Sequence, residues 1–145
     1  MPGHRAERDI QPSDNERPRV LIVDDNPVVQ MLLQDICAEY GWNVAAATTV
    51  DDAILAAGLQ HVDLILLEWQ LRDRDGDPID NVYALRAICP ATPIVVVTEQ
   101  SPEALALAVA HAGGQGVVGK PCSVAEVTAL LKRYRPAVAD LAVSR

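Results

Sequence analysis

Short apolar runs alternate along this chain with longer stretches in which apolar residues recur at helical spacing. The runs predict strands at residues 20–23, 43–47, 62–67, 93–97 and 117–118. Most of them are continuously apolar rather than alternating, which is typical of strands buried on both faces of a parallel sheet. A strand of that kind needs helices packed on each side of the sheet.

The stretches between and after these runs have helical periodicity. They predict helices over residues 27–40, 49–58, 82–89, 101–112 and 123–134. The first helix carries an apolar face at four-residue spacing, formed by Val28, Leu32, Ile36 and Tyr40. Ser101 is predicted to cap one N-terminus ahead of a proline, and Ser123 with Glu126 forms a capping box at another. The order predicts an α/β fold, a doubly wound five-stranded parallel sheet sandwiched by helices.

The two ends of the chain differ from this pattern. Residues 1–18 contain prolines and mixed charges without an apolar period, which predicts a disordered N-terminal arm. Residues 136–145 are expected to form a short C-terminal tail, so residues 19–135 are the predicted domain. The charged N-terminus does not resemble a secretion signal, and no apolar run is long enough to span a membrane, so we expect a cytoplasmic protein.

Acidic residues dominate the predicted domain. Residues 20–131 hold 15 acidic and 4 basic side chains, and the whole chain has a formal net charge of −8. A domain with this charge is not expected to bind nucleic acid. Three scattered cysteines match neither a disulfide framework nor a zinc site.

Five chemically active residue types fall where the predicted strands end. These are Asp24, Asp25, Glu68, Thr98 and Lys120. Ligands of doubly wound sheets bind beyond the carboxyl ends of the strands, so these side chains are expected to meet there. Carboxylate oxygens suit Mg²⁺, and a hydroxyl with an ammonium group could hold phosphoryl oxygens.

Residues 19–134 resemble the receiver domain of two-component response regulators, which has a flavodoxin-like fold. The matching segments are residues 20–27, residues 62–71 with Asp75 and Gly76 behind them, residues 93–98 and residues 119–121. Glu68 follows Asp25 by 43 residues, and Thr98 and Lys120 follow Glu68 by 30 and 52 residues. The resemblance implies a signalling module that accepts a phosphoryl group from a histidine kinase, not an enzyme.

The resemblance also implies roles for individual residues. Asp24, Asp25 and Glu68, with the carbonyl of Gln70, would hold Mg²⁺. Thr98 and Lys120 would contact the phosphoryl group. Glu68 stands at the position of the phospho-accepting aspartate.

Four positions depart from the family pattern around that site. Glu68 is one methylene longer than aspartate, and Glu99 is bulky and charged where the family has a small residue. Val117 replaces the aromatic switch residue, and Arg72 replaces a common proline. Together they predict that phosphorylation is not the signal. Glu68 is expected either to imitate a phosphorylated aspartate or simply to pair with Lys120.

We therefore expect a stand-alone, atypical receiver that acts as a phosphorylation-independent protein-interaction module. One alternative is an active Mg²⁺-dependent phosphorelay receiver that is phosphorylated by a histidine kinase. A small α/β hydrolase is a further alternative, although no catalytic base is visible beyond the carboxylates.

The expected partner is a histidine kinase or another signalling protein. Residues 102–112 are rich in Ala, Leu and Val, so this helix is expected to present an apolar face to a partner. We expect this helix, the strand at 117–118 and the last helix to form the face of any homodimer. Trp69 is expected either as an exposed contact residue or packed beside the site.

Overall fold

The structure is a computed structural model that describes residues 16–72 and 75–137. Residues 1–15 and 138–145, which make up most of the two expected tails, lie outside the described residues. The regular elements begin at Arg19 and end at Tyr134.

Strands and helices alternate strictly along the described chain. The strands are β1 (Arg19–Val23), β2 (Asn43–Ala47), β3 (Leu64–Glu68), β4 (Ile94–Thr98) and β5 (Gly116–Gly119). The helices are α2 (Pro27–Glu39), α3 (Val50–Leu59), α4 (Ile79–Ile88), α5 (Pro102–His111) and α6 (Val124–Tyr134). None of these helices is both long enough and apolar enough to cross a membrane.

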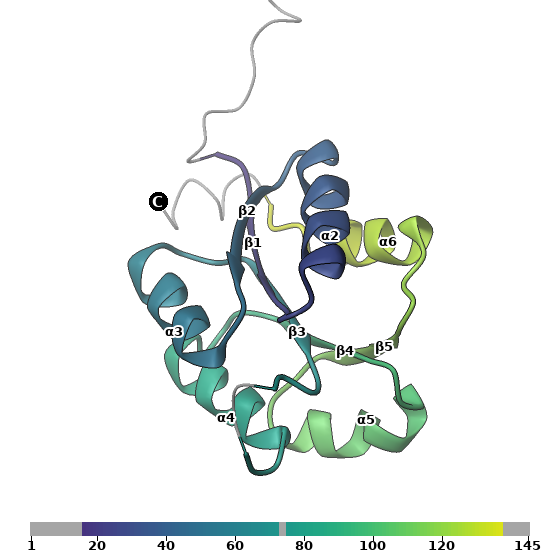
Figure 1. The fold of residues 1–145 in the computed structure, drawn as a ribbon. Helices are drawn as coiled ribbons and strands as arrows, with labels where there is room; N and C mark the ends of the chain where they lie inside the picture. The colour runs from purple at the N-terminus through teal and green to yellow at the C-terminus, as the bar shows by residue number, and fades with distance from the viewer. Residues whose placement is uncertain (1–15, 73–74, 138–145) are drawn as a thin grey trace, which may run out of the picture.

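All five strands form one parallel sheet in the order β2-β1-β3-β4-β5. The predicted doubly wound sheet is therefore confirmed. The order along the sheet reverses at β1, so β1 and β3 lie side by side at the centre. Figure 1 shows α2 and α6 over one face of the sheet and α3, α4 and α5 over the other.

The sheet divides the hydrophobic core into two clusters. One lies under α3, α4 and α5 and includes Leu21, Ile65 and Val96. The other lies under α2 and α6 and includes Ile22 and Leu66. Successive strand residues point to opposite faces, so continuously apolar strands fill both clusters at once.

Helix α2 corrects one sequence prediction. Its four-spaced apolar face is largely exposed: Val28 is 60% exposed, Leu32 58% and Tyr40 51%. The buried positions are instead Gln30, Leu33 and Cys37. The amide of Gln30 explains why a polar residue faces the sheet, because its Nε2 donates to the carbonyls of Ile22, Asp24 and Ala47.

Helix α5 presents small and apolar residues to solvent, as predicted. Leu107 is 72% exposed, while Val109 packs inward. Ser101 occupies the predicted N-cap position ahead of Pro102, but its hydroxyl donates to Glu103 Oε2 at 2.7 Å and makes no capping hydrogen bond. The capping box of Ser123 and Glu126 at the start of α6 is confirmed.

A half-buried arginine joins the loops at the amino ends of β4 and β5. The guanidinium of Arg86 donates to the carbonyls of Cys89, Thr92 and Gly113, and to Oε1 of Gln115. The same Gln115 oxygen accepts from the amide of Ile94 at 2.7 Å. Arg86 thereby connects α4 with the turns that start two strands.

Candidate functional site

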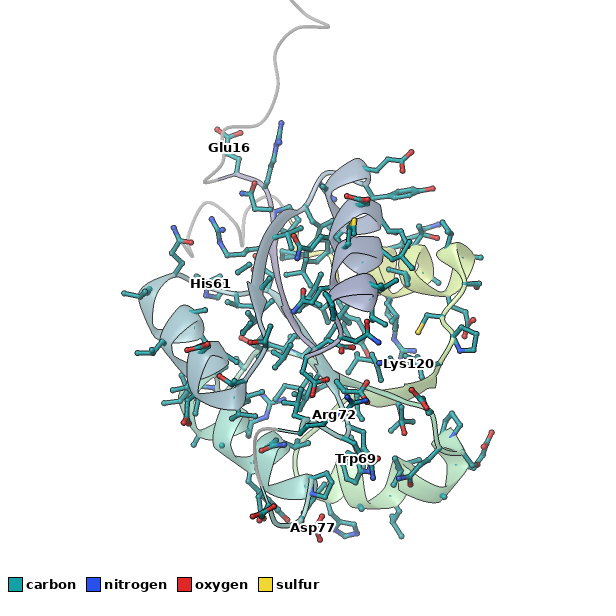
Figure 2. All side chains as sticks on the ribbon, in the orientation of Figure 1. Glu16, His61, Trp69, Arg72, Asp77 and Lys120 are labelled. Carbon is teal, nitrogen blue, oxygen red and sulfur yellow. The ribbon has the colours of Figure 1, made fainter. Side chains whose placement is uncertain are left out.

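The predicted site residues meet at the carboxyl edge of the sheet. Each of them follows or ends one of the strands β1, β3, β4 and β5. All of them except Val117 line a cavity of about 430 Å³, together with loop residues 70–72, 76 and 78. Figure 2 shows Lys120, Arg72 and Trp69 along this edge, between α2 and α5.

Lys120 lies between two carboxylates. Its Nζ is 2.6 Å from Glu68 Oε2 and 2.9 Å from Asp24 Oδ2. The three side chains are 12%, 9% and 3% exposed, respectively. Charges this close and this buried attract each other more strongly than on an open surface, because water screens them less. The amide of Lys120 also donates to Thr98 O at 2.7 Å, which fixes the start of the loop after β5.

The burial of this cluster changes its titration. Burial raises the pKa of Glu68, although the hydrogen bond to Lys120 works in the opposite direction. Burial alone would lower the pKa of Lys120, but the carboxylates of Glu68 and Asp24 outweigh it and the pKa is raised. Lys120 therefore stays protonated at neutral pH and balances part of the local negative charge.

The remaining carboxylate oxygens bind backbone amides. Asp24 Oδ1 accepts from Asn26 N at 2.8 Å, and Asp25 Oδ2 accepts from Arg72 N at 3.0 Å. Glu68 Oε1 lies 3.4 Å from Gln70 N. These bonds are intrachain, and they hold the loops around the cavity in place.

The predicted Mg²⁺ ligands are thus close together but already engaged. Asp24 and Glu68 each use both oxygens within the protein, while one oxygen of Asp25 has no partner within the part of the chain that the structure describes. Within residues 16–72 and 75–137, no three acidic, histidine or cysteine side chains are grouped so that they could hold a metal ion. As arranged, these side chains contact one another and the surrounding backbone, and the assignment of Asp24, Asp25, Glu68 and Gln70 as ligands stays a prediction.

Thr98 and the three remaining residues that depart from the family pattern lie in different places around the site. Thr98 is buried, and its Oγ1 accepts from Gln100 N at 2.9 Å. Glu99 is exposed at the rim of the cavity. Val117 on β5 packs against the core cluster under α5, and its side chain is partly buried. Arg72 is exposed and lines the cavity, where its backbone amide binds Asp25.

The structure shows which of the two expected positions, exposed or packed beside the site, Trp69 occupies. Its side chain is only 7% exposed and belongs to the core cluster under α3, α4 and α5, so it packs beside the site.

The sequence did not predict the role of Gln30, whose side-chain amide links the loop after β1 to the end of β2. A lone glutamine in an amphipathic helix carries no signal for that role, because its partners are carbonyls distant in sequence.

Comparison with known proteins identifies relatives of this arrangement. The family model of the response regulator receiver domain matches residues 20–132. The chain is 34% identical over 125 residues to the probable transcriptional regulatory protein TcrX of Mycobacterium tuberculosis, covering 83% of this chain and 53% of TcrX. The chain spans about half the length, or less, of the curated relatives it matches.

Solved structures agree on the fold. The receiver domain of the TMAO respiratory system regulator TorR is 28% identical with a TM-score of 0.72, covering 80% of this chain and 94% of TorR's. A Burkholderia pseudomallei response regulator, solved with a phosphorylated aspartic acid, calcium ion and citrate, is 21% identical with a TM-score of 0.71. That match covers 87% of this chain and 71% of the other.

The fold, the meeting of the predicted site residues and the family match all indicate the same family. The β2-β1-β3-β4-β5 order is that of the doubly wound receiver fold, and the matched residues span every strand and most of the last helix. The chain belongs to the response regulator receiver domain family of two-component signalling.

Proposed function

We propose that this receiver domain is a phosphorylation-independent protein-interaction module, with Glu68 in place of a phospho-accepting aspartate. The observation that carries the proposal is the position of Lys120, held between Glu68 and Asp24. This ammonium already satisfies the carboxylate that would have to attack a phosphoryl donor. The domain acts by binding a signalling protein, and it is not an enzyme.

The length of Glu68 supports the proposal. An additional methylene displaces the carboxylate by roughly a bond length, and about 1 Å of misplacement can cost about a hundredfold in such a transfer. Glu68 Oε2 is buried, and among the residues that the structure describes it has no hydrogen-bond partner besides the close contact with Lys120. Attack through Oε2 would therefore compete with the ion pair.

The charge at the rim of the cavity also supports the proposal. Glu99 places a further carboxylate where an incoming phosphoryl donor would pass. Like charges repel, so a phosphorylated donor is disfavoured at this mouth. Val117 offers no aromatic ring that could move with Thr98, so a phosphoryl group would lack the usual route to the α5 face.

Intact mass after incubation with Mg²⁺ and acetyl phosphate tests the proposal. We expect no phosphoryl adduct on the wild type and an adduct on Glu68→Asp, because the shorter side chain withdraws from Lys120. Glu68→Gln is the matched control, since it retains the length of the side chain but cannot form an acyl phosphate. Adding Glu99→Ala to Glu68→Asp should accelerate formation of the adduct.

An adduct on the wild type would contradict the proposal. It would support the alternative, an active phosphorelay receiver phosphorylated on Glu68. An unchanged rate on adding Glu99→Ala would remove the argument from the rim charge.

We also propose α5, β5 and α6 as a homodimer face. The support is the exposure of Leu107 and the neighbouring alanines on α5. Sedimentation velocity tests this: Leu107→Asp should reduce self-association about tenfold, because it places a charge in an apolar contact. A profile identical to the wild type at all concentrations would exclude this face.

A further inference from the structure

The edge strand β2 lacks the features that usually protect the edge of a sheet. Among the strands that the structure describes, β2 pairs with β1 alone, so its outer side has no strand partner. Its residues, Asn43–Ala47, include no charged residue and no proline, and its register with β1 runs without a bulge. Natural proteins commonly use such features to keep other chains from pairing with an edge. The outer side of β2 is therefore open to an added strand.

Alternate residues of β2 direct their backbone groups away from the sheet. The amide of Asn43 donates to Pro18 O at 2.8 Å, and Ala47 O accepts from the backbone amide that follows β1 at 3.0 Å. Both ends of β2 therefore face β1. Successive residues of a strand point their backbone groups to opposite sides, so the N–H and C=O groups of Val44 and Ala46 point outward. An extended segment can pair with these groups, whereas a helix uses its own backbone groups internally.

A second cavity lies beside this edge. Its volume is about 450 Å³, and it is lined by one stripe of α2, by residues 46–48 and by Asp52 in the first turn of α3. Helices α2 and α3 cover opposite faces of the sheet (Figure 1), so a cavity lined by both lies outside the outermost strand. The stripe of α2 extends over about two turns, about 10 Å. It consists of Pro27, Gln30, Met31 and Gln34.

The walls of this second cavity combine an apolar surface with an unbalanced charge. Met31 is 59% exposed, and its flexible thioether can adapt to an apolar side chain placed against it. Ala46 adds only a methyl group, so the cavity stays open above the end of β2. The Asp52 carboxylate forms no ion pair with a residue that the structure describes. A ligand that fills the cavity should therefore offer an apolar side chain and a cation.

We propose that β2 accepts an extended segment of a partner protein as an additional strand, with an Arg or Lys of that segment beside Asp52. The backbone groups of Val44 and Ala46 hold the segment, and the cavity selects an apolar side chain that contacts Met31. This inference rests on the proposed protein-interaction function and defines the conformation and the charge of the partner segment.

Synthetic peptides can test the proposal on the full chain. The probe is a fluorescein-labelled peptide of about seven residues, an ordinary strand length, which alternates Val and Thr between a Lys at each end. Its twin carries N-methyl groups on two successive central amides, which removes one donor from each edge of the peptide. We expect the probe to bind about tenfold more tightly than the twin, because the twin cannot complete the backbone hydrogen bonds. Anisotropy measures binding, and amide NMR shifts should centre on residues 43–48.

Variants of the chain separate the backbone from the charge. Ala46→Pro removes the outward N–H and should weaken the probe about tenfold, while an edge strand tolerates proline at such a position. Far-UV circular dichroism checks that this variant folds, and the N-methylated twin tests the same bonds on the wild type.

A second peptide, with Glu in place of both Lys residues, tests the charge. We expect it to bind about fivefold more weakly than the probe, and Asp52→Asn should remove most of this preference. Asp80→Asn is the matched control, because Asp80 is also an exposed acid in the first turn of a helix, and it should leave the preference within about twofold.

Four results would overturn the proposal. They are no binding of the probe up to about 1 mM, equal affinity for the probe and its N-methylated twin, shifts centred away from β2, and self-association of the chain that Ala46→Pro abolishes. The last result would make a second copy the occupant of the edge. A phosphoryl adduct on the wild type would instead defeat the proposed function and leave strand pairing at β2 standing, so the two failures are distinguishable.

Discussion

Two cations lie at opposite edges of the sheet, Lys120 largely buried and Arg86 half-buried, and they are stabilised in different ways. At the carboxyl edge, Lys120 contacts the carboxylates of Asp24 and Glu68. At the amino edge, Arg86 is held by three backbone carbonyls and the side-chain oxygen of Gln115. The groups around Lys120 carry full charges and lie beside an open cavity. The groups around Arg86 are uncharged dipoles within packed loops.

The difference separates a titratable site from a structural one. Carbonyl groups have no protonation equilibrium in the range of protein stability, and a guanidinium does not lose its proton there. Carboxylates and an ammonium do titrate, and burial shifts the pKa of Glu68 upward. The interactions of the Lys120 cluster should therefore vary with pH, whereas those of Arg86 should not.

Removing Arg86 should have the largest effect on stability. Arg86→Met leaves the carbonyls of Cys89, Thr92 and Gly113 without this donor, and the predicted loss in the free energy of unfolding is about 2–4 kcal/mol. Urea unfolding at pH 5, 7 and 9 should show the same deficit at each pH. A deficit that changes with pH would show that a titrating neighbour contributes.

Removing Lys120 should have a smaller, pH-dependent effect. Lys120→Met leaves Asp24 and Glu68 as neighbouring carboxylates, but water in the cavity limits the loss to about 1–3 kcal/mol at pH 7. Without Lys120 the raised pKa of Glu68 rises further. Because the folded variant then binds more protons than the unfolded chain, its stability should recover as pH falls.

The stability difference between the wild type and Lys120→Met should also decrease at alkaline pH. The pKa of Lys120 is raised in the folded state, so its contribution is present below the ordinary value of 10.5 and is lost as pH rises through the folded value. The stability difference between the wild type and Lys120→Met should therefore be greatest near neutral pH. A flat difference from pH 4 to pH 11, which chemical unfolding at each pH would reveal, contradicts this assignment.

Neutralising Glu68 should have the smallest effect. Glu68→Gln removes a buried charge whose pKa is raised by burial, while the amide oxygen can still accept from Lys120. We expect the free energy of unfolding at pH 7 to rise by less than about 1 kcal/mol. Asp24→Asn is the contrasting control, because it also weakens the bond from Asn26 N, and it should destabilise.

The sequence predicted the architecture well for a local reason. Continuously apolar runs such as Leu64–Leu67 are typical of a sheet covered on both faces, and the five predicted strands alternate with helical periods. The helix boundaries were also close where a cap is encoded, as at Ser123. The prediction for α2 was wrong because an apolar period does not show which of two apolar faces meets the sheet.

The site was predictable only in part. Strand order places the ends of β1, β3, β4 and β5 together, so the five site residues were expected to meet. The contacts within the site depend on side-chain reach. No sequence pattern shows that Lys120 contacts both Glu68 and Asp24, or that Glu99 lies at the rim of the cavity.

The sequence by itself determined the doubly wound fold, the acidic edge and the presence of glutamate at position 68. These follow from local periodicity and from residue identity, which do not depend on distant contacts. Only the tertiary structure decided that Lys120 neutralises Glu68, that Trp69 is buried and that Val28 and Leu32 face solvent. Each of these depends on which side chains compete for the same space and the same charge once distant segments have been brought together.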